Sequence, residues 1–415
     1  MKKLLLCTTA LFGLAAGSAL AGEDVAVTFH GQSKFEAGTK KQDTDHKGYL
    51  PNSPNQKSSA FYTSQKASLK AEGKTDTLTY GAVLRLQMVG DQSDGMGDTH
   101  NDRSHIYLDT DMGSVHLGSN FSASKLMQID AGVIASATGG VDGDWTNFAG
   151  GDVTKNASSV NVNDRKLLSS VFTSLAVTGV DTLANRLDSG ESSRKITYMS
   201  PRISGLQLGV SFAPDFNNSG TGTENADMMY LGLPVKVKNL WSLGLNYTNT
   251  INDVKFALSA VADKGQTSRQ EVFGTEEKFR DLKTYSIGGS VATNGVSVAL
   301  SYHNDGQSLT LKSQDRFKSS WWTAGVAYEN GPMSVSLTYL AGTKGAKNDG
   351  IRVKSQMVAL GADYEVAPGL KPFAEVTMVQ YKPRYDKVTV VANGNTYDTK
   401  KAKATVFMVG TKLKF

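Results

Sequence analysis

Five basic side chains in the first quarter of the chain occur at positions from which they could act together on charged solutes. They are Lys34, Lys66, Lys70, Arg85 and Arg103. If apolar neighbours such as Leu69 and Leu84 face lipid, the two-residue period of a strand turns all five, together with His105, to the opposite face. A charge on the lipid face costs about 2–4 kcal/mol at the membrane centre and little in a water-filled lumen. The pattern therefore predicts a basic wall along one side of an aqueous pore.

Four acidic residues lie downstream in one long polar segment, residues 121–192. They are Asp130, Asp142, Asp144 and Asp152. If this segment lies opposite the basic wall, the two would set up a transverse electric field at the narrowest point of the pore. Such a field orders water and selects solutes by polarity. Each of these charges could instead be solvated at the rim.

Other site chemistry has little support in the sequence. The six histidines show no H-E-x-x-H or comparable metal-ligand spacing. The acidic run from Asp91 to Asp102 does not match an EF-hand and is more simply read as solvated charge. No G-x-S-x-G, P-loop or dinucleotide motif occurs. We therefore expect no catalytic residue, no cofactor and no bound metal.

Composition and the first residues indicate an exported protein. Residues 1–21 contain two lysines, a short apolar run and the ending Ala19-Leu20-Ala21, the pattern of a secretory signal peptide, which leaves 22–415 as the exported barrel. The only cysteine, Cys7, lies in this segment, so no disulfide is available to the remainder. The formal charge of +5 is too small to suggest a nucleic-acid partner.

The elements that must position the charged residues are strands. Apolar and hydroxyl residues alternate through 333–339, and the same pattern recurs at 241–247, 296–302 and 405–415. Seven short turns rich in Gly, Pro, Asn and Asp separate such strands, at 73–76, 110–113, 200–203, 249–253, 293–295, 329–332 and 367–369. Longer polar segments alternate with these turns. With an opening and a closing strand, the sequence predicts an all-β, 16-stranded antiparallel transmembrane β-barrel with an aqueous lumen.

A soluble β-sandwich or β-helix is the alternative fold. It would turn its apolar faces inward and would expose edge strands protected by charge. Aromatic residues instead end the predicted strands, as in the girdle at a membrane interface. These residues are Tyr198, Phe212, Tyr247, Tyr302, Tyr328, Tyr339, Tyr364 and Phe415. The membrane barrel is therefore favoured.

One connection is much longer than the others. The second and third short turns lie about 91 residues apart, whereas neighbouring turns elsewhere lie about 36 to 50 residues apart. The surplus falls in residues 121–192, and a loop of this length in a compact protein is usually functional. We expect it to fold into the barrel and to constrict it; a flexible external loop is the alternative.

The order of these parts resembles that of the general bacterial porins of Gram-negative outer membranes. Residues 105–120, HIYLDTDMGSVHLGSN, resemble the strand, tight turn and strand that precede the constriction loop in that family. Residues 193–205, SRKITYMSPRISG, resemble the hairpin that follows the loop, and the terminal Phe415 resembles the family's assembly signal. The resemblance implies homotrimers in the outer membrane and passive diffusion of small hydrophilic solutes and ions. The family often has an arginine just after the Leu-Gly of the strand before the loop, where this chain has Ser119-Asn120 after Leu117-Gly118. We therefore transfer no pore residue from the family to this chain.

The leading functional hypothesis is a non-specific, trimeric diffusion channel in the outer membrane. Small residues expected on the outside, Ala67, Ala71 and Ala82, would permit close approach of barrels. A solute-selective channel would need aromatic or arginine residues along the lumen, whereas inward positions such as Ser336 and Thr338 are small. An enzyme in the barrel wall would need an outward Ser-His pair, whereas the strand histidines point inward. A closed structural or adhesion barrel stays open as the third possibility.

Overall fold

The structure is a computed structural model. It describes residues 25–42, 58–89, 98–148, 193–215, 228–230, 233–235, 237–267, 269–272, 275–310, 312, 318–345, 352–383, 388–392, 395–399 and 402–415. The predicted signal peptide, residues 1–21, lies outside these residues, as does the second part of the predicted loop, with Asp152.

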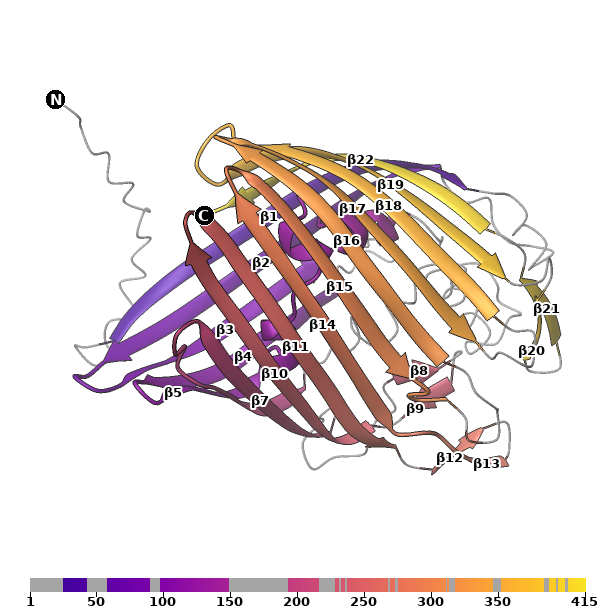
Figure 1. The fold of residues 1–415 in the computed structure, drawn as a ribbon, viewed down its shortest axis with the longest axis horizontal. Helices are drawn as coiled ribbons and strands as arrows, with labels where there is room; N and C mark the ends of the chain where they lie inside the picture. Colours follow the sequence, from indigo (N-terminus) through magenta and orange to yellow (C-terminus); the bar gives the residue numbers. More distant parts are fainter. Residues whose placement is uncertain are drawn as a thin grey trace.

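Sixteen antiparallel strands form one closed barrel, and Figure 1 shows these strands running side by side around it. In order around the barrel they are β1 (Val25–Gln42), β2 (Ser59–Lys74), β3 (Thr79–Val89), β4 (Asp98–Thr110), β5 (Gly113–Ser119), β6 (Arg194–Met199), β7 (Leu206–Asp215), β10 (Val237–Ile251), β11 (Val254–Thr267), β14 (Leu282–Thr293), β15 (Val296–Gly306), β16 (Lys318–Asn330), β17 (Met333–Gly345), β18 (Arg352–Tyr364), β19 (Leu370–Pro383) and β22 (Ala402–Lys414). The predicted strand number and antiparallel order are confirmed.

The two faces of the barrel wall carry opposite kinds of side chain. On β15, Leu300 is 58% exposed on the outer face, and its neighbour Ser301 is 4% exposed on the inner face. On β17, the outward Leu337 and the buried Thr338 repeat this arrangement. An apolar exterior with a hydroxyl-rich interior is the reverse of a soluble sandwich and fits a barrel surrounded by lipid. Among the helices that the structure describes, none has the length and apolarity to span a bilayer.

Short turns join the strands at one end of the barrel. All seven predicted turns are present, between β2 and β3, β4 and β5, β6 and β7, β10 and β11, β14 and β15, β16 and β17, and β18 and β19. In the turn after β10, Asn252 and Asp253 have φ of 48° and 63°, the left-handed backbone of a type I′ hairpin.

The longer connections at the other end contain three small hairpins that the sequence analysis did not predict. They pair β8 (Met228–Tyr230) with β9 (Leu233–Val235), β12 (Arg269–Val272) with β13 (Thr275–Lys278), and β20 (Val388–Ala392) with β21 (Asn395–Thr399).

The last residue closes the barrel. β1 pairs with both β2 and β22, and beyond β22 the Phe415 N–H donates to the Gly31 carbonyl oxygen at 3.0 Å, while the Gly31 N–H donates to the Phe415 carbonyl oxygen at 2.7 Å. The Phe415 ring lies over Gly31, where a Cβ would overlap it. Phe415 therefore pairs and packs at the seam between the first and last strands.

Candidate pore constriction

The segment that follows β5 begins with four short helical turns. They are α1 (Ala123–Met127) and the 3₁₀-helices η2 (Ala131–Ile134), η3 (Gly140–Asp142) and η4 (Asp144–Asn147). Ser122 caps α1, and the Asp130 carboxylate caps η2 by accepting from the Gly132 N–H at 2.8 Å. These turns are the described part of the predicted loop, and Figure 1 shows them inside the outline of the barrel.

Backbone N–H groups attach this segment to the inner wall. Each of five donates to a buried hydroxyl on an inward-facing position: Ala123 to Ser211 at 2.7 Å, Ile129 to Ser259 at 3.0 Å, Ala131 to Thr323 at 3.0 Å, Ser136 to Ser336 at 2.7 Å and Val141 to Thr338 at 3.0 Å. The acceptors belong to β7, β11, β16 and β17. Residues 121–148 therefore run inside the barrel along its wall, and the small inward residues that the sequence analysis took as generic include the acceptors that hold them.

Inward glycines make room for the segment at the same places. A Cβ on Gly325 would lie 3.1 Å from Ala131, and one on Gly361 would lie 3.0 Å from Ala137. At Gly288 a Cβ would overlap the Ile129 carbonyl oxygen. The distances at Gly325 and Gly361 are tighter than most real Cβ contacts, and the contact at Gly288 is with backbone, so the segment lies directly on the wall.

Two carboxylates bind the middle of the segment. Glu375 on β19 is 1% exposed and accepts from the Thr138 N–H at 3.1 Å, the Thr138 hydroxyl at 2.8 Å and the Gly140 N–H at 3.3 Å. Asp363 on β18 accepts from the Ala137 N–H at 2.8 Å. The sequence analysis missed both residues. Their only signal was an acid at an inward position of a strand.

The far end of the described segment reaches the seam between β1 and β22. Asp144 forms an ion pair with Lys34, which also lies 3.3 Å from the fully buried Glu36. Lys412 on β22 donates to the Ala137 carbonyl oxygen. Trp145 is 1% exposed within an apolar cluster that includes residues of β16–β19 and β22. Asp144 and Lys34, expected on opposite sides of a pore, are therefore in direct contact.

The other residues of the predicted basic wall lie on the inner face, accompanied by acids. Lys70 lies 2.6 Å from Glu72. Asp102 forms an ion pair with Arg85 and lies 3.9 Å from Lys66. The register of β3 and β4 shifts between Arg85 and Leu86. A bulge of this kind lets consecutive residues share a face, and both Asp102 and Arg103 point inward here.

Arg103 approaches the beginning of the loop, with its guanidinium carbon 3.6 Å from the centre of the Phe121 ring. The wall therefore carries charges of both signs. The sequence analysis had read Asp102 as solvated charge in a loop and had not considered Glu72, so it predicted only the basic residues of this wall.

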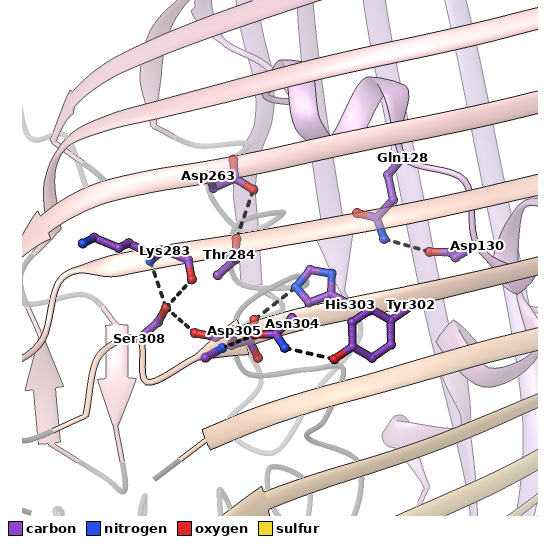
Figure 2. A network of polar contacts seen from close by, with 11 residues as sticks. Gln128, Asp130, Asp263, Lys283, Thr284, Tyr302, His303, Asn304, Asp305 and Ser308 are labelled. Carbon is purple, nitrogen blue, oxygen red and sulfur yellow. Dashed lines mark hydrogen bonds and ion pairs between the residues drawn. The ribbon is translucent and has the colours of Figure 1, made fainter. Parts of the chain in front are cut away.

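Two of the predicted loop acids border a single recess. Asp130 and Asp142 line a cavity of about 270 Å³ together with Lys125, Gln128 and Val133. The Gln128 amide donates to Asp130 at 3.0 Å, as Figure 2 shows. The recess therefore presents carboxylates, an ammonium group and an amide on the loop.

Buried polar side chains of the wall contact the first helical turn of the segment. The Ser124 hydroxyl donates to the buried Asp263 at 2.7 Å, and Thr284 lies 3.5 Å from the same carboxylate (Figure 2). Nearby, His303 contacts Asp305 at 3.1 Å and stacks on Trp321 with ring centres 3.8 Å apart. Within the described ranges, no group of three His, Cys, Asp or Glu side chains is arranged to hold a metal ion.

Comparisons with known proteins agree with this architecture. Over the full length of both chains, the sequence is 27% identical to an uncharacterised protein of Rickettsia conorii. The anion-selective porin from Comamonas acidovorans has a similar fold, with a TM-score of 0.56 and 15% identity over 94% of this chain and 100% of that one. OmpT of Vibrio cholerae in its trimer form gives a TM-score of 0.55 and 13% identity over 95% of this chain and 100% of that one.

A profile described as Gram-negative porin matches residues 8–384, which is most of the sequence. Such a match, together with the closed sixteen-stranded barrel and its apolar exterior, establishes both family and location. The chain belongs to the Gram-negative porin family and forms a channel in the outer membrane.

Proposed function

We propose that the protein is a general diffusion channel for small hydrophilic solutes and ions, in which residues 121–148 narrow the lumen and set the size limit. The observation that carries this proposal is the attachment of that segment to the inner wall from β7 to β22. A sixteen-stranded barrel without such an insertion is a wide channel. The described part of the segment lies against β6, β7, β10, β11, β15–β19 and β22, so we infer that the conducting path runs past β2–β4, which carry most of the basic residues.

Weak ion selectivity is part of this proposal. The cations of the wall are accompanied by carboxylates, with Lys70 beside Glu72 and Arg85 beside Asp102. Opposite charges in contact largely cancel at distances greater than their own separation, and salt screens the remainder beyond a Debye length of about 8 Å. The wall therefore discriminates only weakly between cations and anions.

Accessibility of one loop residue tests the position of the segment. Val133 is 56% exposed on η2 and borders the recess, and Val298 is 52% exposed on the outer face of β15. Val133→Cys should react with a charged, membrane-impermeant thiosulfonate and lose single-channel conductance. Val298→Cys, matched in residue type and exposure, should react slowly in a bilayer and keep its conductance.

Unchanged conductance after complete labelling of Val133→Cys would place the segment outside the conducting path. Liposome swelling with sugars of increasing mass measures the size limit on the same samples. A conductance that saturates with one particular solute would favour a selective channel over general diffusion.

We also propose that the protein is a homotrimer that associates through the outer face of β2 and β3. Ala71 and Ala82 are direct partners across these strands, and Ala67 lies on the same outward face. Small side chains let two barrels approach closely. The trimer form described for OmpT of Vibrio cholerae, which has a similar fold, supports this proposal.

A further inference from the structure

The outer face of the barrel has an uneven distribution of charge. Among the outward-facing strand side chains that the structure describes, none is a carboxylate. Basic residues on this face lie near the loop end of their strands and are all exposed. They are Lys41, Arg194, Lys264, Lys283, Lys318, Lys354 and Lys403. The outside of the barrel therefore has a positive rim where the long loops begin.

Two lysines of this rim face each other. Lys264 on β11 and Lys283 on β14 are direct partners in the strand register, and Lys264 is also the partner of Trp241 on β10. Like charges directly opposite on neighbouring strands destabilise a sheet. Neither lysine forms an ion pair within the described part of the chain. Figure 2 shows the Lys283 side chain extending away from the inward His303–Asp305 pair.

Aromatic side chains mark the level of this lysine pair in the membrane. Trp241 is 49% exposed and packs on Phe212 with ring centres 4.7 Å apart. Tyr285, two residues from Lys283, is 47% exposed on the same face. Exposed tryptophan and tyrosine are enriched at the level of lipid headgroups. The aromatic residues therefore indicate that Lys264 and Lys283 lie at the level of the headgroup phosphates.

We propose that Trp241, Lys264 and Lys283 form a binding site for the phosphate of an anionic lipid in the outer leaflet. A phosphate offers several strong acceptor oxygens and negative charge, so that one group can take hydrogen bonds from both ammonium groups and remove their repulsion. Because barrels of this kind have long extracellular loops and short periplasmic turns, the leaflet that contacts the rim is the outer one. Trp241 would pack against the lipid next to its headgroup.

Native mass spectrometry with a defined lipid tests the site. The purified protein in a neutral maltoside detergent is titrated with dioleoyl phosphatidic acid, and the dissociation constant is measured for each variant. Each lysine near an anionic surface strengthens binding about fivefold. Removing two, in Lys264→Ala/Lys283→Ala, should therefore weaken binding about 30-fold. Lys264→Arg/Lys283→Arg should bind within about threefold of the unchanged protein, since both charges remain.

A control at the opposite end separates the site from general attraction. Lys255 and Lys414 are exposed near the short turns, so Lys255→Ala/Lys414→Ala removes the same charge from the other end of the barrel. That variant should bind the lipid as the unchanged protein does. Equal weakening in both alanine variants, or none in Lys264→Ala/Lys283→Ala, would overturn the proposal.

Two further measurements complete the test. Displacement of the lipid by inorganic phosphate at the same concentration would also overturn the proposal, because it would indicate a site for a free anion. Conductance of Lys264→Ala/Lys283→Ala should be unchanged, since these lysines face away from the lumen. Failure of the lipid site is therefore distinguishable from failure of the channel proposal.

Discussion

Replacing Gly288 with alanine should displace the inserted segment while leaving the barrel intact. Gly288 lies on the inner face of β14, paired with Ser259 and Ser301, and a Cβ there would overlap the Ile129 carbonyl oxygen and lie 3.0 Å from its carbon. The peptide of Ile129 must therefore move by roughly 1 Å or more before ordinary contact distances return. Alanine itself fits a strand, so the change acts on the segment.

The energetic cost follows from the neighbouring hydrogen bonds. A shift of Ile129 strains its N–H contact with Ser259 and the next one, from Ala131 to Thr323, both 3.0 Å long. Losing both would cost about 2 kcal/mol, at about 1 kcal/mol for each hydrogen bond. A loss of about 2 kcal/mol raises the population of positions in which the segment is detached around Ile129 about 30-fold. We therefore expect altered single-channel conductance with increased open-channel noise.

The adjacent residue supplies the control. Gly289 faces outward, and a Cβ there would meet only the Leu258 side chain at 2.8 Å and the Ala257 carbonyl at 3.2 Å. Gly289→Ala should conduct as the unchanged protein does, and both variants should keep the heat-dependent gel shift of a folded barrel. If Gly288→Ala and Gly289→Ala conducted identically and without added noise, the segment could not rest on β14 as described.

Other perturbations probe the remaining attachments and the seam. Glu375→Gln removes the negative charge that accepts hydrogen bonds from three donors of the segment. If this costs about 2 kcal/mol, hydrogen exchange at the Thr138 and Gly140 amides should accelerate about 30-fold. Unaltered exchange would contradict the attachment. Deleting Phe415 removes the residue that pairs with Gly31 and should lower the amount of assembled protein in the outer membrane, measured by fractionation; normal levels would refute its role. Ala71→Trp should convert a trimer to monomers in size-exclusion chromatography with light scattering, and Ala260→Trp, outward on β11, should not.

Strand positions and turns could be predicted because they depend on local patterns. The alternation through 333–339 fixes which face each residue occupies, and a pair such as Asn252-Asp253 signals a hairpin without reference to the remainder of the chain. The inward position of the basic residues was predicted for the same reason, whereas their role in lining a pore stays a prediction. Each basic residue needed only its own strand parity to be placed inside.

The partners of those residues could not be predicted, because they depend on register between distant strands. Asp102 reaches the inner face through a bulge opposite Arg85, which strict alternation does not anticipate. Glu375 acts on residues that lie 235 and 237 positions away in the sequence. Asp144 was expected to oppose the wall, but the path of the segment takes it to Lys34. The loop's length was visible in the sequence, and its route was not.

The way in which the inserted segment is held also bears on how such channels diversify. The inner wall recognises N–H groups, which every amino acid except proline supplies, whereas the side chains of Val133 and Asp142 border the recess. Attachment to the wall and the lining of the recess thus depend on different residues of the same segment. Substitutions at the residues that border the recess can accumulate without redirecting the chain, so relatives can change the lining of the channel while inheriting one scaffold.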